Sequence, residues 1–174
     1  VAPHTLIPRP ETEMLVEAAL ELLPATPARV LDLGTGSGAI ALALASERPA
    51  WRITGVDRVP EAVALAERNG ARLKLVNASF VESHWFSALA GQRYQLIVSN
   101  PPYIAETEEL SEEVRTFEPA SALFAGGDGL DRYPAEPRAL AARMAEVYGL
   151  PADRVLPVRG LTHGLELVFR LAAR

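Results

Sequence analysis

The chain has 174 residues, of which 49% are hydrophobic and 22% are charged, and this composition suits a globular domain with one core. It contains no cysteine, which excludes disulfides and thiolate chemistry and fits a cytoplasmic protein. The formal net charge of −5 argues against general affinity for nucleic acid. No apolar run approaches the ~20 residues that a membrane-spanning helix needs, and the pattern predicts no metal site.

Helices and strands are predicted to alternate along most of the chain. The predicted helices cover residues 10–23, 39–47, 60–69 and 83–90. The predicted strands cover residues 29–33, 51–56, 73–76 and 94–99. Strands that alternate with helices of this length imply a parallel sheet with right-handed crossovers, in which ligands bind at the carboxyl ends of the strands.

A glycine-rich loop, Gly-Thr-Gly-Ser-Gly at residues 34–38, follows the first predicted strand. Glycine lets the backbone turn sharply and approach a ligand closely. Asp57 ends the next strand, and its carboxylate can accept both hydroxyl groups of a ribose. The pattern fits a dinucleotide and S-adenosylmethionine equally. A bare tight turn, followed by an ordinary helix-capping aspartate, is the structural alternative.

The fourth predicted strand ends in Asn100, Pro101, Pro102 and Tyr103. Proline fixes its own φ and cannot extend a sheet, so this segment is expected to be a stiff bracket that presents an amide, free carbonyls and a ring. A planar amide or amine can donate to the Asn100 oxygen and the Pro101 carbonyl while Tyr103 packs on its face. A rigid strand-terminating turn is the alternative. Because these residues also follow a strand end, one cleft is expected to hold them together with the glycine loop.

Six segments occur together along the first three quarters of the chain. They are residues 6–13 (Leu-Ile-Pro-Arg-Pro-Glu-Thr-Glu), 32–38, 60–69, 85–86 (Trp-Phe), 99–104 (Ser-Asn-Pro-Pro-Tyr-Ile) and 117–119 (Phe-Glu-Pro). Over roughly residues 5–131 the chain thereby resembles the protein-(glutamine-N5) methyltransferases of peptide-chain release factors. The resemblance implies a Rossmann-like class I fold, S-adenosylmethionine as cofactor, and transfer of its methyl group to a glutamine amide of a release factor.

The resemblance also implies roles for individual residues. The expected cofactor-binding residues are Gly34, Thr35, Gly36, Ser37, Gly38, Asp57, Trp85 and Asn100. Trp85 is expected beside the adenine, although a core or lid aromatic is an open alternative. The expected catalytic residues, which would grip the glutamine amide, are Asn100, Pro101, Pro102 and Tyr103. In place of the acid that the family usually carries before the tryptophan, this chain has His84.

Residues 132–174 are expected to form an atypical tail that is not an independent domain, behind a methyltransferase domain at residues 1–131. The tail is similar to an early segment of histidinol-phosphate-type aminotransferases, with predicted helices at residues 139–148 and from about residue 165 to Ala173. Such enzymes need a Schiff-base lysine, whereas the only lysine, Lys74, lies in a predicted strand of the other part. Aminotransferase activity is therefore not expected, and the parallel sheet is expected to be incomplete at its carboxyl-terminal edge.

Two other functions remain open at this point. Asn-Pro-Pro-Tyr is shared with adenine-N6 nucleic-acid methyltransferases, but the acidic balance and the lack of a basic recognition segment count against that reading. A truncated or chimeric domain that binds S-adenosylmethionine without turnover is the other alternative. No membrane association is expected.

Overall fold

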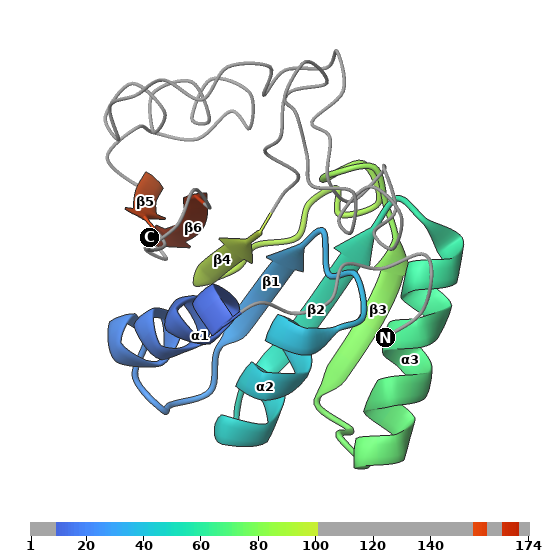
Figure 1. Cartoon of the computed structure of the whole chain (residues 1–174), viewed down its shortest axis with the longest axis horizontal. Coiled ribbons are helices and arrows are strands. Elements are labelled where there is room, and N and C mark those ends of the chain that lie inside the picture. The colour runs from blue at the N-terminus through green and yellow to red at the C-terminus, as the bar shows by residue number, and fades with distance from the viewer. Residues whose placement is uncertain (1–9, 101–154, 160–164, 171–174) are drawn as a thin grey trace.

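The computed structural model describes residues 10–100, 155–159 and 165–170. In this part of the chain, three helices accompany a six-stranded sheet (Figure 1). The helices are α1 (Pro10–Leu22), α2 (Ala39–Glu47) and α3 (Pro60–Leu73). The strands are β1 (Arg29–Leu33), β2 (Arg52–Asp57), β3 (Ala78–Glu82), β4 (Leu96–Ser99), β5 (Val155–Arg159) and β6 (Leu165–Arg170).

The strand order across the sheet is β3-β2-β1-β4-β6-β5. The first four strands of the chain pair in parallel, which confirms the predicted α/β fold with a parallel sheet. β6 pairs antiparallel with β4, and β5 pairs antiparallel with β6. Among the described residues the parallel strands end at β4, and the tail continues the expected incomplete edge with two antiparallel strands.

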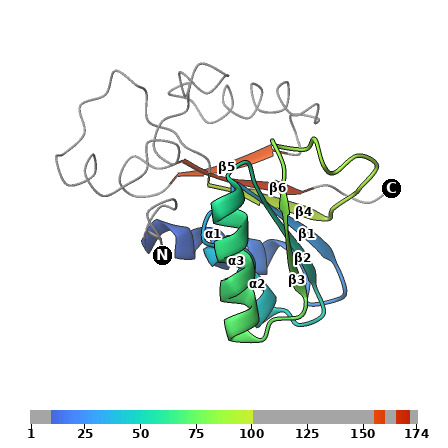
Figure 2. The same cartoon turned by 90° about the vertical axis from the view of Figure 1, so that its right-hand side faces the viewer.

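The three described helices lie on the same side of β1, β2 and β3, as the turned view in Figure 2 shows. The core of this layer is built from apolar side chains of α1 and α2 packed on β1, β2 and β4. Its buried members are Leu15, Ala19, Leu23, Ala28, Val30, Ile40, Ala41, Leu44, Ala45, Trp51, Ile53, Leu96 and Val98. Within residues 10–100, no helix has the length and apolar character needed to traverse a bilayer.

The chain between α3 and β3 differs from the prediction. α3 continues through Gly70, where an added Cβ would lie 3.3 Å from a methyl group of Leu42, so this glycine serves close packing rather than the end of the helix. The predicted strand at residues 73–76 is wrong: Lys74 caps α3 at a φ of 59°, and Val76 is 98% exposed. The strand starts later because the Asn77 amide donates to three carbonyl groups at the base of the sheet and so fixes the chain there.

Two further predictions of helix are wrong. Residues 83–90 form turns, and the φ of 52° at Trp85 is incompatible with a right-handed helix. Residues 165–170 form β6, because β4 offers an edge of backbone groups that a short apolar run can pair with. The predicted helix at residues 139–148 lies outside the described residues.

Candidate functional site

Four parallel strands end at the same edge of the sheet (Figure 1). Leu33, the last residue of β1, pairs with Ser99 of β4 on one side and with Val56 of β2 on the other. The glycine loop (residues 34–38) directly follows Leu33, and Asn100 directly follows Ser99. The structure therefore brings the glycine loop and the start of the Asn-Pro-Pro-Tyr segment together at one edge, as expected.

The three glycines of the loop do different things. Gly34, Gly36 and Gly38 all have positive φ, of 74°, 54° and 82°. An added Cβ at Gly34 or Gly36 would meet nothing within 4 Å, whereas one at Gly38 would lie 3.1 Å from the Cβ of Ala66. The first two glycines therefore border open space that a ligand can enter, and Gly38 allows α2 and α3 to pack closely.

The other two residues of the loop hold its shape. Thr35 and Ser37 are buried. The Thr35 hydroxyl donates to Oδ2 of Asp32 at 2.7 Å, and the Thr35 N–H donates to the Val56 carbonyl at 2.9 Å. The Ser37 carbonyl accepts from the Asn69 side chain at 2.9 Å. These contacts tie the loop to β1, β2 and α3.

Asp57 lies between the glycine loop and the start of α3, whose N-cap residue is Val59 rather than Asp57. Its Oδ2 accepts from the Gly36 N–H at 2.9 Å, which joins it to the glycine loop. Its Oδ1 accepts from the Val59 N–H at 3.0 Å, in the manner of a short turn before α3. Each oxygen keeps a further lone pair, so the carboxylate can still accept a ligand hydroxyl.

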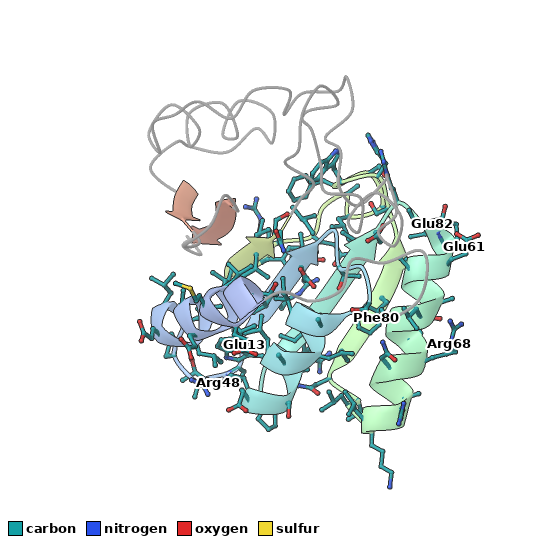
Figure 3. All side chains as sticks on the ribbon, viewed as in Figure 1. Glu13, Arg48, Glu61, Arg68, Phe80 and Glu82 are labelled. Atoms are coloured by element: carbon teal, nitrogen blue, oxygen red, sulfur yellow. The ribbon has the colours of Figure 1, made fainter. Side chains whose placement is uncertain are left out.

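Negative charge gathers at the carboxyl end of β2 and β3. Figure 3 shows Glu61 and Glu82 at this end, and both residues are exposed. Together with Asp57 they make three carboxylates, and Arg58 is the one basic residue of the stretch 57–61. This balance favours a cationic ligand over the pyrophosphate of a dinucleotide.

Asp32 is a further polar residue of the site, which the sequence analysis did not single out. It is fully buried in β1, where its Oδ2 accepts from the Thr35 hydroxyl and from the Ala41 N–H at 3.2 Å. Its Oδ1 has no hydrogen-bond partner. Burial raises the pKa of this carboxyl group to about 7; its two hydrogen bonds oppose the rise, and the charge of Asp57 adds to it. An acidic residue inside an otherwise apolar predicted strand is the sequence feature that could have identified Asp32.

The turn after β3 lies against the end of β2. The Ser83 N–H donates to the Asp57 carbonyl at 2.8 Å, and Trp85 follows two residues later, half-buried. Further down the same strand, Phe80 lies between the sheet and α3 (Figure 3). An added Cβ at Gly55 would lie 2.6 Å from the Phe80 ring, so only glycine fits there. No pattern in the sequence predicts that Ser83 ties this turn to β2.

Asn100 is half-buried and directly follows β4. It is held in place through its neighbour Ser99, whose buried hydroxyl donates to the Leu33 carbonyl at 2.8 Å. The other three residues expected there, Pro101, Pro102 and Tyr103, lie outside the described residues. Among the residues that are described, no group of three or more histidine, aspartate or glutamate side chains is arranged to hold a metal ion.

Comparison with known proteins identifies the family of this chain. The family model of the methyltransferase small domain matches residues 11–128. A release factor glutamine methyltransferase from Pseudomonas aeruginosa is 68% identical over 132 residues, which cover 75% of this chain and 48% of that protein. One from Escherichia coli is 58% identical over 131 residues, covering 75% of this chain and 47% of the relative. The chain thus spans about half the length of these curated relatives.

One alignment extends into the tail. The release factor glutamine methyltransferase of Shewanella oneidensis is 51% identical over 172 residues, or 98% of this chain and 57% of that protein.

Solved structures agree on the fold. The hMettl16 catalytic domain superposes with a TM-score of 0.61 at 16% identity, covering 99% of this chain and 75% of that one. The precorrin-6y C5,15-methyltransferase of Geobacter metallireducens superposes with a TM-score of 0.53 at 13% identity, covering 94% and 89%. The fold is that of the class I methyltransferases, and the chain belongs to the methyltransferase small domain family.

Proposed function

We propose that this chain carries the reaction site of a protein-(glutamine-N5) methyltransferase that uses S-adenosylmethionine and acts on a peptide-chain release factor. The observation that carries the proposal is the register of β1 and β4, which sets Asn100 beside the glycine loop. An amide-recognising segment next to a nucleoside-type loop suits transfer to a carboxamide. The names of the relatives, at 51–68% identity, support the same substrate.

The described residues fit the cofactor. Gly34 and Gly36 border open space, and the Asp57 carboxylate can accept ribose hydroxyl groups beside them. Trp85, at the end of the neighbouring strand, would pack on the adenine. We assign Thr35, Ser37 and Gly38 to the shape of the loop rather than to direct contact. When bound, S-adenosylmethionine supplies an electrophilic methyl group on a sulfonium centre.

On the acceptor side, Asn100 would orient the glutamine amide. An amide nitrogen is a weak nucleophile because its lone pair is delocalised, so position counts for more than a strong base. The Asn100 oxygen and the Pro101 carbonyl would accept its two N–H groups, while Pro102 and Tyr103 complete the grip. The new bond is N–CH3, the bond that breaks is S–CH3, and the proton leaves the methylated amide for solvent.

The same proposal assigns a role to the tail and a cellular compartment to the reaction. We propose that residues 1–131 hold the reaction site, and that residues 132–174 extend the sheet through β5 and β6 rather than form a domain. A release factor works on ribosomes, so the reaction would take place in the cytoplasm.

Gly36→Ala is expected to weaken binding of S-adenosylhomocysteine by about tenfold or more, because a methyl group would enter the open space. The matched control is Gly91→Ala. Gly91 also has a positive φ (74°) and open surroundings, but it precedes Gln92, which bonds to Arg29 at the opposite end of β1. Both variants should lose about 1–2 kcal/mol of stability. Calorimetric titration checks that only the first loses affinity; equal affinities would remove Gly36 from the site.

The function is tested by mixing the purified chain and methyl-labelled S-adenosylmethionine with a release factor, and in parallel with duplex DNA. Label on the release factor is the expected result, and it should vanish when the target glutamine is replaced by alanine. Label on DNA would replace this proposal by an adenine-N6 methyltransferase. Calorimetric binding of the cofactor with no label on either substrate would leave a domain that binds without turnover.

A further inference from the structure

Ser83 connects the two elements that would face the nucleoside. Its N–H donates to the Asp57 carbonyl at 2.8 Å, and its hydroxyl donates to the Trp85 carbonyl at 2.8 Å. The same hydroxyl oxygen accepts from the Ala88 N–H at 3.1 Å and lies 3.4 Å from the Ser87 hydroxyl. The side chain is buried, at 5% exposure. One small residue thus fixes the turn after β3 to the end of β2.

Trp85 needs such a support because its backbone is in the left-handed region, at a φ of 52°. A bulky residue rarely adopts this conformation, which is strained and persists only where neighbouring contacts impose it. Strain of this kind collects at ligand clamps. The Ser83 hydroxyl donates directly to the carbonyl of this residue and so acts on its backbone.

We infer that Ser83 is a positioning residue, which holds Trp85 in its left-handed conformation so that the indole meets the adenine of the bound nucleoside. The inference rests on the proposed function, and specifically on its cofactor site. The base of a nucleoside is attached to its ribose, so a ribose bonded to Asp57 directs its base to an adjacent element. The turn that Ser83 ties to Asp57 is such an element, and Trp85 is its large aromatic residue.

The test uses Ser83→Ala, Ser83→Thr and the control Ser79→Ala in the full chain. Ser79 lies on β3, four residues before Ser83; it is exposed, and its hydroxyl makes a long contact of 3.4 Å to the Ile53 carbonyl. Affinity for S-adenosylhomocysteine is measured by calorimetry. Ser83→Ala is expected to bind about tenfold more weakly, Ser83→Thr within about threefold of the parent chain, and Ser79→Ala unchanged.

Tryptophan fluorescence gives a readout that a purely structural role would not move. The chain has two tryptophans, and Trp51 is fully buried with its indole N–H bonded to the Pro24 carbonyl at 3.1 Å. Its emission should stay constant, so a change at saturating ligand reports on Trp85. We expect ligand to quench emission in the parent chain and in Ser83→Thr, and to quench it less in Ser83→Ala even at saturation.

The outcomes separate this inference from the proposed function. If the parent chain does not bind S-adenosylhomocysteine, the cofactor site itself is wrong and the role of Ser83 is overturned with it. If the parent chain binds and Ser83→Ala matches it in affinity and quenching, the role of Ser83 alone is overturned. Should Ser83→Ala fail to fold, Ser83→Cys keeps the shape of the side chain with a larger atom and a weaker hydrogen bond, and its affinity should lie between that of the parent chain and the expected loss.

Discussion

Replacing Asn100 by alanine is expected to lower methyl transfer to the release factor by about 100-fold or more, with affinity for S-adenosylmethionine changed by no more than about threefold. The amide oxygen of Asn100 is the group that would orient the acceptor nitrogen, so its loss leaves the substrate amide free to rotate. Ser99 keeps the backbone in place through its bond to the Leu33 carbonyl. Single-turnover kinetics check the expected loss of transfer, and calorimetry on the same preparation checks the unchanged affinity for the cofactor.

The contrasting variant is Asn69→Ala. Asn69 also carries an amide, but it donates to the Ser37 carbonyl and thus supports the glycine loop from α3. Its loss should weaken cofactor binding while transfer at saturating cofactor is largely kept. If both variants lose binding and transfer in equal proportion, Asn100 belongs to the cofactor side and the acceptor assignment is wrong.

The sequence predicted the parts of the fold where local and tertiary signals agree. The strand at residues 29–33 and the helix at residues 39–47 were predicted with the bounds that the structure has. Both segments have a strong local pattern: one is a short apolar run before a glycine loop, and the other is rich in alanine and leucine. For the same reason, the sequence correctly predicted that the glycine loop and Asn100 lie at one edge of the sheet.

The errors fall where tertiary contacts decide. Leu73 to Val76 alternates like a strand, yet the chain turns there because the amide of Asn77, the next residue, donates to three carbonyl groups of the segment 45–51. The predicted helix ended before Gly70, but α3 continues through this residue, whose lack of a side chain lets α3 pack closely against α2. The apolar run at residues 165–170 has no decisive period, and the partner that makes it a strand, β4, lies far away in the sequence.

The sequence predicted which residue types lie at this edge of the sheet, but not which contacts each of them makes. The location of the site follows from the glycines, the aspartate and the asparagine found at or just after the ends of strands. That Gly34 and Gly36 border open space while Gly38 packs against Ala66 depends on where the helices lie. The contribution of Ser83 depends on the conformation of Trp85, for which a serine two residues earlier carries no local signal.

The buried carboxyl group of Asp32 should make the stability of the chain depend on pH. Its pKa rises from 3.8 to about 7 on folding, mainly because it is buried. Between these two values the folded state holds a proton that the unfolded state has released, so this group makes stability fall as pH rises through the window. The shift of about 3 units corresponds to up to about 4 kcal/mol, complete above about pH 7.

Asp32→Asn should remove this dependence. The asparagine oxygen can take over the bonds that Oδ2 accepts from Thr35 and Ala41, and its amide then stands where the protonated Oδ1 was. We expect the free energy of unfolding of the variant, relative to that of the parent chain, to increase by up to about 4 kcal/mol as pH rises from 4 to 8. Denaturant titrations at each pH measure this difference.

The control for Asp32→Asn is Glu47→Gln, which removes an exposed acid at the end of α2 and should follow the parent chain at every pH. Asp32→Ala separates charge from hydrogen bonding, because it removes the acceptor of the Thr35 hydroxyl as well and should be less stable than Asp32→Asn throughout. A stability difference between Asp32→Asn and the parent chain that stays constant from pH 4 to 8 would mean that this carboxyl group is ionised in the fold. Its unpaired oxygen would then have to find a partner, and the loop that Thr35 anchors would be held by a charge instead of a neutral acid.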